Sequence, residues 1–494
     1  GLKEIVALSE NGMTTEAAGA YAGLRVNQAR SRVIEDLKSS GLMEKEESIM
    51  HRTPLCERSR TPVEIIPLQD YYVKQLDFVP QLRELALKIK FHPDMHRQVL
   101  LNWLDSVAID WPVSRRRFYG TEIPIWYCNA CRAPVLPPPG KYYRPWKEKP
   151  PIDRCEKCGG LEFTGEERTF DTWMDSSISP LYVTGFGRDK DLFDYAYPTS
   201  LRPQAKDIIR TWLHYTMLRC MQLTGEMPWT DAWIMGYGVD EKGEKMSKSK
   251  GNVIDPFPVI QKYGADTFRF WSASEANLGY DFRCSEQRIS GAQKFLSKLW
   301  NVGRFLSSFE VVSEKPAQLE ASDRWILAEL AKLEQECMLG YDEYNFFVPA
   351  NAVRDFAWNL FAAHYIEMVK GRAYATDNDA GKKSALYTLH RCFSAILLLS
   401  APMTPFITEE LWTKIYSDRS IHLQKMYRNQ DAESEMAKYT RQITEFNSYV
   451  WNKKKETIKD GKPLSLKDPI DIPVPAELDL FKDDLKSMHN LTSA

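Results

Sequence analysis

The sequence predicts an α/β domain followed by an all-α domain, and two patterns carry this prediction. Between about residues 168 and 283, strand-like and helix-like segments alternate, which is typical of a parallel sheet covered by helices. From about residue 284 onward only helical patterns occur, as in a helical bundle. Ahead of the α/β region, two Cys-x-x-Cys pairs predict a small metal-binding insertion.

The elements in the first part of the chain, up to the end of the α/β region, follow from local hydrophobic spacing. Apolar residues that recur at helical intervals predict helices over residues 26–42, 94–107 and 206–223. The segments 181–186 (LYVTGF) and 232–239 (AWIMGYGV) read as strands because they are short, apolar and bounded by glycine or polar residues.

In the C-terminal region the helical pattern is continuous. An apolar stripe at helical spacing marks the first helix: Phe295, Leu299, Val302 and Leu306. Further helical patterns cover residues 346–371, 382–400 and 408–417. The last predicted helix, 434–459, carries three consecutive lysines at 453–455, which are either a contact for RNA phosphates or, as in most charge runs, a solvated face.

The composition indicates a folded protein of two to four domains. Of 494 residues, 43% are hydrophobic, and the near balance of 65 Lys+Arg with 67 Asp+Glu gives no overall sign of a nucleic-acid binder. No apolar run approaches the roughly 20 residues of a membrane helix, and no signal or transit peptide is evident. We therefore expect a cytoplasmic protein without membrane contact. Because the chain lacks an initiator Met, we expect it to begin inside a domain.

Four of the nine cysteines form two hooks suited to a metal ion. Cys128 and Cys131 make the first hook, Cys155 and Cys158 make the second, and 23 residues separate the two. Two such hooks can close a tetrahedral thiolate cage, the usual form of a structural zinc site. The alternatives are two coincidental pairs or a redox dithiol. A site closed by four thiolates leaves no open position, so we expect zinc with a structural role.

The segment 235–256 carries most of the chemical information. Glycines at the end of a predicted strand allow the backbone to approach a planar ligand closely. A tight turn and a loop with three lysines and two hydroxyls follow, over residues 245–250. Such a loop can neutralise the charge of a polyphosphate during phosphoryl or nucleotidyl transfer. Composition alone leaves a solvated surface loop as the commoner explanation.

The string Lys-Met-Ser-Lys-Ser at 245–249 resembles the signature loop of class I aminoacyl-tRNA synthetases. The resemblance implies a Rossmann-type sheet, with Lys245 and Lys248 as the catalytic lysines that stabilise the ATP phosphates. Glycines 236 and 238 would lie beside adenine, and Asp207 would contact the ribose. The nucleotide-binding set implied by the family is Gly236, Gly238, Asp207, Lys245, Ser247, Lys248 and Ser249.

Two further segments are similar to the valyl-tRNA synthetases: D-T-W-M-D-S-S (171–177) and, in its archaeal-type form, R-P-Q-A-K-D-I-I-R-T-W (202–212). The segment W-P-V-S-R-R-R-F-Y-G-T-E-I-P (111–124) resembles the place where an inserted domain rejoins the catalytic sheet in the family, and P-M-T-P-F-I-T-E-E-L-W (402–412) resembles the anticodon-binding domain of the valine, isoleucine and leucine group. By this resemblance Asp171 and Trp173 would line the amino-acid pocket, although Trp173 could equally be a core residue. The family implies valine–tRNA ligation with ATP, Mg²⁺ and structural Zn²⁺, the partners valine and tRNA(Val), an editing activity against threonine, and a monomer.

The resemblance divides the chain into the C-terminal half of a Rossmann-type catalytic domain with a zinc knuckle, followed by an all-α anticodon-binding bundle. The expected segments are an editing-domain remnant (1–45), a connection (46–127), the zinc knuckle (128–165), the catalytic half (166–283), the anticodon-binding domain (284–430) and a tail (431–494).

A second family signature is missing from the sequence. None of the eight histidines forms the His-x-Gly-His type string that contacts ATP phosphates in the family. We therefore expect these 494 residues alone to have little activity. The alternatives are a relative of the isoleucyl-tRNA synthetases, a non-catalytic tRNA-binding protein, or a zinc-ribbon nucleic-acid binder.

Overall fold

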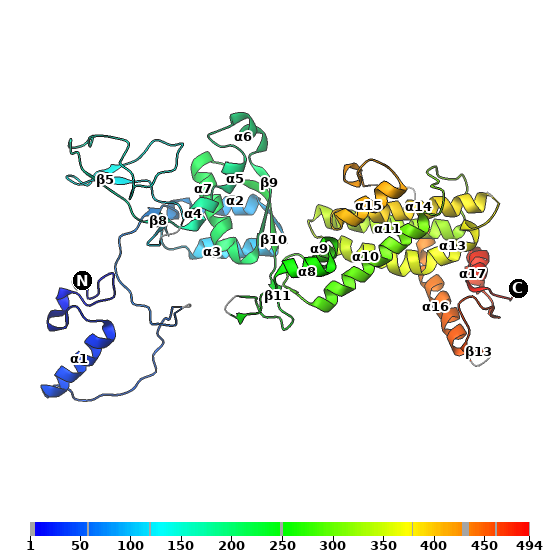
Figure 1. The fold of residues 1–494 in the computed structure, drawn as a ribbon, viewed down its shortest axis with the longest axis horizontal. Helices are drawn as coiled ribbons and strands as arrows, with labels where there is room; N and C mark the ends of the chain where they lie inside the picture. Colours follow the sequence, from blue (N-terminus) through cyan, green and yellow to red (C-terminus); the bar gives the residue numbers. More distant parts are fainter. Residues whose placement is uncertain are drawn as a thin grey trace. The chain divides into compact units, whose positions relative to one another are not determined.

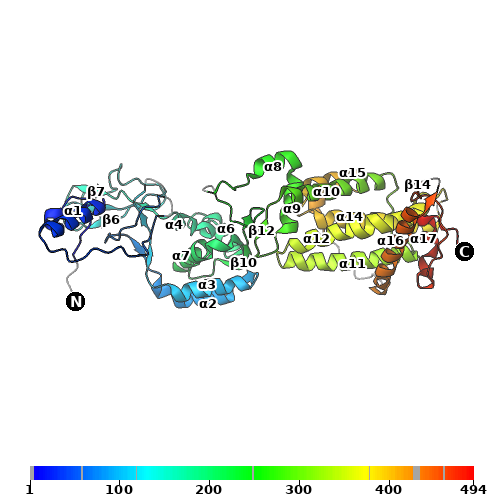
Figure 2. The same cartoon turned by 90° about the horizontal axis from the view of Figure 1, so that it is seen from below.

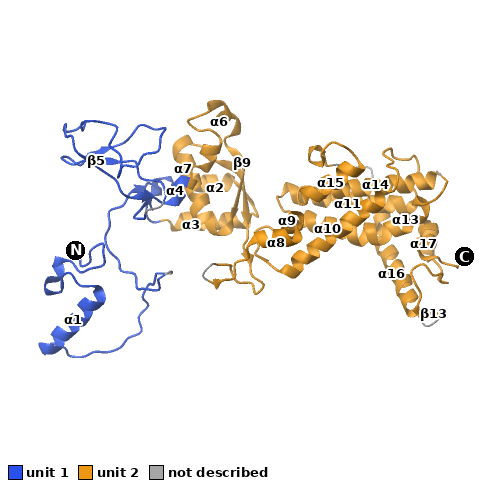
Figure 3. Ribbon diagram, in the orientation of Figure 1, with its two compact units in different colours: residues 1–78, 108–175 blue, residues 79–107, 176–494 orange. Residues whose placement is uncertain are grey.

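The computed structural model describes residues 5–56, 59–117, 120–247, 250–377, 379–426, 434–459 and 462–493. The chain forms two compact units (Figure 3). Unit 1 comprises residues 1–78 and 108–175, and unit 2 comprises residues 79–107 and 176–494. No described helix is long and apolar enough to cross a membrane.

The described residues of unit 1 form one long helix and three small antiparallel sheets. The helix α1 (Val26–Ser39) confirms the helix predicted over 26–42. The strands pair as β1 with β3, as β4 with β8, and in the order β6-β5-β7. Their bounds are β1 (Tyr72–Val73), β3 (Trp111–Pro112), β4 (Ser114–Arg115), β5 (Trp126–Cys128), β6 (Pro134–Val135), β7 (Phe163–Gly165) and β8 (Thr169–Phe170).

The first part of unit 2 is built on a parallel sheet, as predicted. The strands β2 (Lys90–His92), β10 (Trp229–Met235) and β9 (Thr199–Ala205) pair in the order β2-β10-β9. The middle strand is fully parallel to both neighbours, with Ala232 opposite Phe91 on one side and Arg202 on the other. The alternating strands and helices therefore form an α/β sheet, whose strands lie near the middle of Figure 1.

Helices pack beside this sheet. The helices α2 (Val79–Lys88) and α3 (Met95–Ser106) lie side by side (Figure 2), and α3 confirms the helix predicted over 94–107. The predicted helix 206–223 is also present. It begins as a short 3₁₀ turn, continues as a π-helical segment over Ile209–Leu213, and ends as α7 (His214–Thr224) before Gly225, which has a left-handed backbone.

The prediction of a strand over residues 181–186 is wrong. These residues begin inside the short helix α5 (Ser179–Val183), which has Pro180 in its first turn. A proline at this position favours a helix start because its backbone nitrogen needs no hydrogen-bond partner there. Leu181 is buried, so the apolar run contributes to the core from a helix and not from a strand.

After the sheet, the chain forms a second, short pair of strands ahead of the helical bundle. The strands β11 (Gly238–Val239) and β12 (Phe282–Arg283) are parallel. Between them lie α8 (Pro256–Tyr263) and α9 (Ala265–Glu275). The Asp255 side chain accepts a hydrogen bond from the Phe257 amide and caps α8.

Most of the remaining described residues form the predicted helical bundle, in which long helices run alongside one another (Figure 2). The stripe at 295–306 is wholly buried, as predicted. The bundle helices are α10 (Glu286–Leu306), α11 (Ala321–Asp342), α12 (Phe347–Asp355), a π-helical segment (Phe356–Tyr365), α13 (Ile366–Ala373), α14 (Ala380–Ser400), α15 (Pro405–Ile415), α16 (Thr440–Glu456) and α17 (Lys482–His489).

Buried charge joins the C-terminal helices to the rest of the bundle. The Arg372 guanidinium donates to the carboxylates of Asp323 and Asp484, at 2.9 Å in each case. Lys454 of the lysine run is fully buried, and its ammonium donates to the carbonyl oxygens of Leu466 and His489 at 2.7 Å. The middle lysine of the run is thus neither solvated nor available to RNA.

Candidate nucleotide and metal sites

The four predicted cysteines lie together in unit 1. The Sγ atoms of Cys128 and Cys158 are 3.6 Å apart, as are those of Cys131 and Cys155, and all four lie within 4.8 Å of one another. Four zinc–sulfur bonds of about 2.3 Å at tetrahedral angles place the sulfur atoms about 3.8 Å apart. The cluster therefore has the dimensions of a site that could hold zinc.

Two tight turns position the sulfur atoms. The Arg132 amide donates to the Cys128 carbonyl, and the Gly159 amide donates to the Cys155 carbonyl, both at 2.8 Å. A Cβ atom on Gly160 would approach the Cys128 sulfur to 3.0 Å, so this position has room for little more than glycine. The knuckle therefore depends on small residues as well as on the thiols.

The thiols influence one another strongly. The Cys131 amide, as the leading cause, lowers the pKa of Cys128 to about 7. At Cys158 the Gly160 amide acts in the same direction, but the neighbouring thiols of Cys131 and Cys128 outweigh it and raise the pKa to about 12. Because adjacent thiolates repel, full ionisation of the cluster requires a compensating cation.

In unit 2, the KMSKS loop (residues 245–249) follows β11 and a polar turn that fixes its start. The Asp240 carboxylate accepts hydrogen bonds from the amides of Lys242 and Glu244, at 3.0 and 2.8 Å. The Asn252 side chain joins both ends of the loop, because its amide donates to Asp240 at 2.8 Å and its carbonyl accepts from the Ser247 amide at 2.9 Å.

Lys245 projects from this loop toward β9. Its ammonium lies 4.2 Å from the centre of the Tyr237 ring and 3.8 Å from the Asp207 carboxylate. The Lys206 ammonium lies against the same ring, at 4.9 Å, and pairs with Asp281 at 2.7 Å. The structure thus brings together Lys245 and Asp207, two predicted site residues that are 38 positions apart in the sequence.

The two predicted glycines are constrained by close packing. A Cβ atom on Gly236 would lie 1.9 Å from the Tyr280 carbonyl oxygen, which is closer than any real contact. On Gly238 it would meet the Met246 side chain at 3.3 Å. Gly236 therefore allows the backbone of the strand end to approach residue 280, and Gly238 makes room for the methionine of the KMSKS loop.

Not every predicted residue can be placed. Lys248 and Ser249 lie outside the described residues. Ser247 is placed through the contact of its amide with Asn252. The roles of Gly236, Gly238, Asp207, Lys245 and Ser247 in binding a nucleotide stay predictions.

Asp171 and Trp173, predicted for the amino-acid pocket, belong to unit 1. The Asp171 carboxylate accepts from Arg115 at 2.7 Å and from the Trp111 indole at 3.3 Å. It also accepts from the Trp173 amide at 3.2 Å, at the start of the short helix α4 (Thr172–Ser176). These contacts give Asp171 a structural role, and its part in an amino-acid pocket stays a prediction.

Sequence reasoning missed several residues that shape the loop. Tyr237 lies between the two predicted glycines and supports Lys245, whereas Asp240 and Asn252 hold the loop ends. The only local signal was their position in or beside a polar turn. Their pairing across twelve residues becomes visible only in three dimensions.

Comparison with protein families identifies the class. Residues 24–285 match the model of tRNA synthetases class I (I, L, M and V). Residues 323–467 match the anticodon-binding domain of tRNA ligases. Because the first match covers more than half of the chain, this protein belongs to the class I tRNA synthetases that comprise the isoleucine, leucine, methionine and valine enzymes.

Curated relatives indicate which enzymes of this class the chain resembles. The chain is 42% identical to the valine–tRNA ligase of Aeropyrum pernix over 99% of its own length, and 42% identical to that of Pyrobaculum aerophilum over 96%. It is 39% identical to the valine–tRNA ligase of Nanoarchaeum equitans, again over 99% of its length. The chain spans 60%, 60% and 63% of these relatives.

Solved structures share the fold. Methionyl-tRNA synthetase of Mycobacterium tuberculosis in complex with methionyl-adenylate matches with a TM-score of 0.56 at 19% identity, over 73% of this chain and 65% of that chain. A LeuRS–tRNA–LeuAMS complex from Agrobacterium radiobacter K84 matches with a TM-score of 0.51 at 21% identity, over 67% and 43%. At these identities the likeness concerns the fold alone.

Proposed function

We propose that this chain is part of a valine–tRNA ligase, which activates valine with ATP and transfers it to tRNA(Val). The observation that carries the proposal is the 39–42% identity to archaeal valine–tRNA ligases over nearly the whole chain. The pairing of Lys245 with Asp207 supports this proposal. It places a cation for the phosphates and an acceptor for the ribose hydroxyls together at the end of β9.

In this proposal Lys245 stabilises the triphosphate. Its side chain is 60% exposed, and within the described part of the chain its ammonium is held by an aromatic face and a long ion pair, so an incoming phosphate can compete for it. Release of Lys245 would also free the Asp207 carboxylate to accept hydrogen bonds from ribose hydroxyls. Lys248 and Ser249 would complete the phosphate contacts, and Mg²⁺ would enter bound mainly to the ATP phosphates.

The four-cysteine knuckle is proposed to hold structural Zn²⁺. The sulfur spacing and the tight turns at both hooks fit a tetrahedral ion. With four thiolates the ion has no free coordination position, so it would stabilise residues 128–165 without taking part in the reaction.

The remaining functional assignments are part of the same proposal and rest on the sequence resemblance. Asp171 and Trp173 would border the amino-acid pocket, residues 1–45 would be the end of an editing domain, and residues 284–430 would bind the anticodon arm. The boundaries at 46–127, 128–165, 166–283 and 431–494 belong to the same proposal. We also propose that the protein is cytoplasmic and monomeric.

Binding of tRNA by the 494-residue chain tests the substrate assignment. A gel-shift titration compares a valine tRNA transcript with an isoleucine tRNA transcript. We expect at least tenfold tighter binding of the valine transcript, a difference of about 1.4 kcal/mol. Equal affinities would support a non-specific nucleic-acid binder, and preference for the isoleucine transcript would support the isoleucine-specific alternative.

Pyrophosphate exchange tests the catalytic assignment. The sequence has no His-x-Gly-His string, and loss of such a phosphate clamp removes several kcal/mol of transition-state stabilisation. We therefore expect negligible valine-dependent exchange by these 494 residues alone, and robust exchange would refute this expectation. In a fusion with the N-terminal part of the Aeropyrum pernix relative, exchange should appear and should fall at least 100-fold on Lys245→Ala. The matched control, Lys242→Ala on the preceding turn, should retain it.

A further inference from the structure

The loop between the two cysteine hooks concentrates cations and aromatic rings. Residues 141–149, between β6 and β7 in unit 1, read Lys-Tyr-Tyr-Arg-Pro-Trp-Lys-Glu-Lys. Four cations against one carboxylate give this basic-aromatic loop a charge of +3, although the whole chain carries −2. Local clustering of this kind indicates a surface for a polyanion even where the overall charge does not.

Inward-facing residues anchor the basic-aromatic loop. The Tyr143 ring packs edge-on against Trp126, with the ring centroids 6.0 Å apart. The Trp126 indole in turn donates to the Glu148 carbonyl at 2.8 Å. Pro145 is buried, and its carbonyl oxygen lies so close to Gly165 that a Cβ atom there would approach it to 1.8 Å. The backbone of the loop is therefore held against the small sheet of β5, β6 and β7.

Two other aromatic rings of the loop remain at the surface. The Tyr142 side chain is 55% exposed and the Trp146 side chain is 41% exposed. The Trp146 indole donates to the Glu122 carboxylate at 3.4 Å, and the Arg144 guanidinium lies 5.8 Å from the centre of the Tyr142 ring. Exposed rings beside cations are typical of proteins on which unpaired nucleic-acid bases stack.

Most cations of the loop are available to a ligand. Within the described part of the chain, the exposed side chains of Lys147 and Lys149 have no ion-pair partner, and Arg144 approaches the one carboxylate of the loop only to 3.8 Å. Exposed lysines elsewhere in unit 1 differ, because Lys38 and Lys45 each pair with a glutamate. A charge run is usually a solvated face, but here the free cations adjoin anchored, exposed rings.

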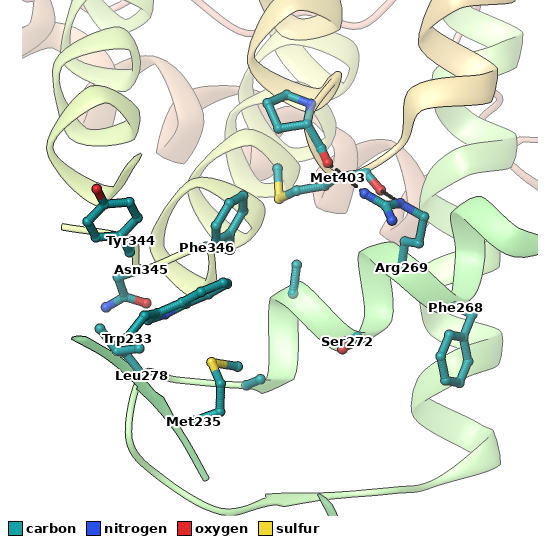
Figure 4. Close-up of a pocket in the computed structure, with 13 residues that line it drawn as sticks. Trp233, Met235, Phe268, Arg269, Ser272, Leu278, Tyr344, Asn345, Phe346 and Met403 are labelled. Atoms are coloured by element: carbon teal, nitrogen blue, oxygen red, sulfur yellow. Dashed lines mark hydrogen bonds between the residues drawn. The ribbon is translucent and has the colours of Figure 1, made fainter. Parts of the chain in front are cut away.

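The cavity in Figure 4 shows why both kinds of group matter. It has a volume of about 410 Å³, lies between β10, α9 and the bundle, and has aromatic walls that include Trp233 and Phe346. The one cation among its described lining residues, Arg269, already donates to the carbonyl oxygens of Pro402 and Met403. The cavity thus offers rings without a free charge, whereas the basic-aromatic loop offers both.

We propose that the basic-aromatic loop binds an unpaired segment of RNA. Bases stack on Trp146 and Tyr142, and backbone phosphates lie against Lys147, Lys149 and Arg144. A duplex presents its phosphates but keeps its bases stacked inside, so the loop favours single strands. The identity of the RNA as tRNA rests on the proposed function, whereas the preference for unpaired RNA does not.

The test uses a fluorescein-labelled single-stranded RNA octamer, whose fluorescence anisotropy is followed as the 494-residue chain is added. Sequence-independent nucleic-acid sites have Kd values of about 1–100 µM, and we expect a value in this range. A blunt RNA duplex of the same length should bind at least about fivefold more weakly, because its bases cannot stack on the rings. An octaglutamate peptide in tenfold excess should not displace the RNA.

One set of variants tests the stacking. Trp146→Ala should weaken octamer binding roughly tenfold, and Trp146→Phe, which keeps a ring, should restore most of the affinity. The matched control is Tyr195→Ala in helix α6 (Lys190–Ala196), because it removes a ring that is 90% exposed on another surface. This control should leave the affinity unchanged.

A second set tests the phosphate contacts. Removal of both Lys147 and Lys149 by alanine should lower the slope of log affinity against log salt concentration by about 1.4, at about 0.7 for each contact with a single strand. The double variant Lys38→Ala with Lys45→Ala removes the same charge from lysines that are already paired. Its slope should equal that of the unmodified chain.

Four results would overturn the proposal: equal binding of octamer and duplex, displacement by the peptide, equal effects of Trp146→Ala and Tyr195→Ala, or an unchanged salt slope without Lys147 and Lys149. Preference for valine tRNA with no effect of Trp146→Ala would uphold the proposed function alone. Octamer binding that depends on Trp146, without preference among tRNAs, would uphold the loop assignment alone. Circular dichroism of each variant establishes that a loss of binding does not reflect unfolding.

Discussion

Replacement of Cys155 by serine gives a direct measure of the metal site. The four sulfur atoms need to move by no more than about 1 Å to surround zinc, because two of their separations are already 3.6 Å and all of them are within 4.8 Å. Structural zinc contributes about 12 kcal/mol of binding energy in small domains, or about 3 kcal/mol per ligand. Cys155→Ser should therefore weaken zinc binding by roughly 100-fold.

The assay is competition with a chromophoric chelator, combined with limited proteolysis of residues 128–165. The unmodified chain should hold one zinc ion per molecule and resist cleavage in this segment, whereas the variant should release the metal and be cut. Cys56→Ser is the matched control, because Cys56 is in the same unit but outside the cluster. A chain that contains no zinc after expression in zinc-supplemented medium, or a control that loses as much metal as the variant, would refute the reasoning.

Three further predictions concern the free energy of unfolding, measured by urea titration or as a function of pH. Gly236→Ala should lower the unfolding free energy by about 3 kcal/mol through overlap with residue 280, whereas Gly291→Ala, in an open helical position, should not lower it. Arg372→Met should cost about 3–5 kcal/mol because it leaves two buried carboxylates without their cationic partner, whereas Arg441→Met, at an exposed pair, should have a much smaller effect. Burial lowers the pKa of His489 to about 4, so the unfolded chain binds the extra proton first and stability falls from pH 6.5 to 4. His489→Gln should reduce that fall by about 3 kcal/mol.

Each of these predictions has a contradicting result. Equal destabilisation by the two glycine variants would show that residue 236 is not closely packed. Equal costs for the two arginine variants would show that burial of the ion pair adds nothing. An unchanged slope of stability against pH in the histidine variant would place the titration on other groups.

The elements that sequence reasoning found were those whose signals are local. The buried stripe on α10 and the two cysteine hooks each lie within one short segment, so spacing alone predicts them. The error at residues 181–186 arose because a short apolar run fits a strand or a helix equally well. There the tertiary packing of Leu181 and the helix start at Pro180 decided the outcome.

Contacts between distant segments could not be predicted. The approach of Lys245 to Asp207 depends on the parallel register of β9 and β10, which brings the ends of both strands to one edge. The burial of Lys454 had a faint signal, because it lies four residues after the buried Val450 and so on the same helix face. A lysine in such a position still reads as exposed unless carbonyl oxygens from other segments are known to meet it.

The accessibility of the Lys454 amine reports whether the C-terminal segment is packed against the bundle. Acylating reagents attack only amines that they can reach, and Lys453 and Lys455 on the same helix provide accessible neighbours for comparison. While residues 466 and 489 remain in place, the central amine is shielded from the reagent. The ratio of labelling among three adjacent lysines, read by mass spectrometry, therefore measures how often the end of the chain detaches.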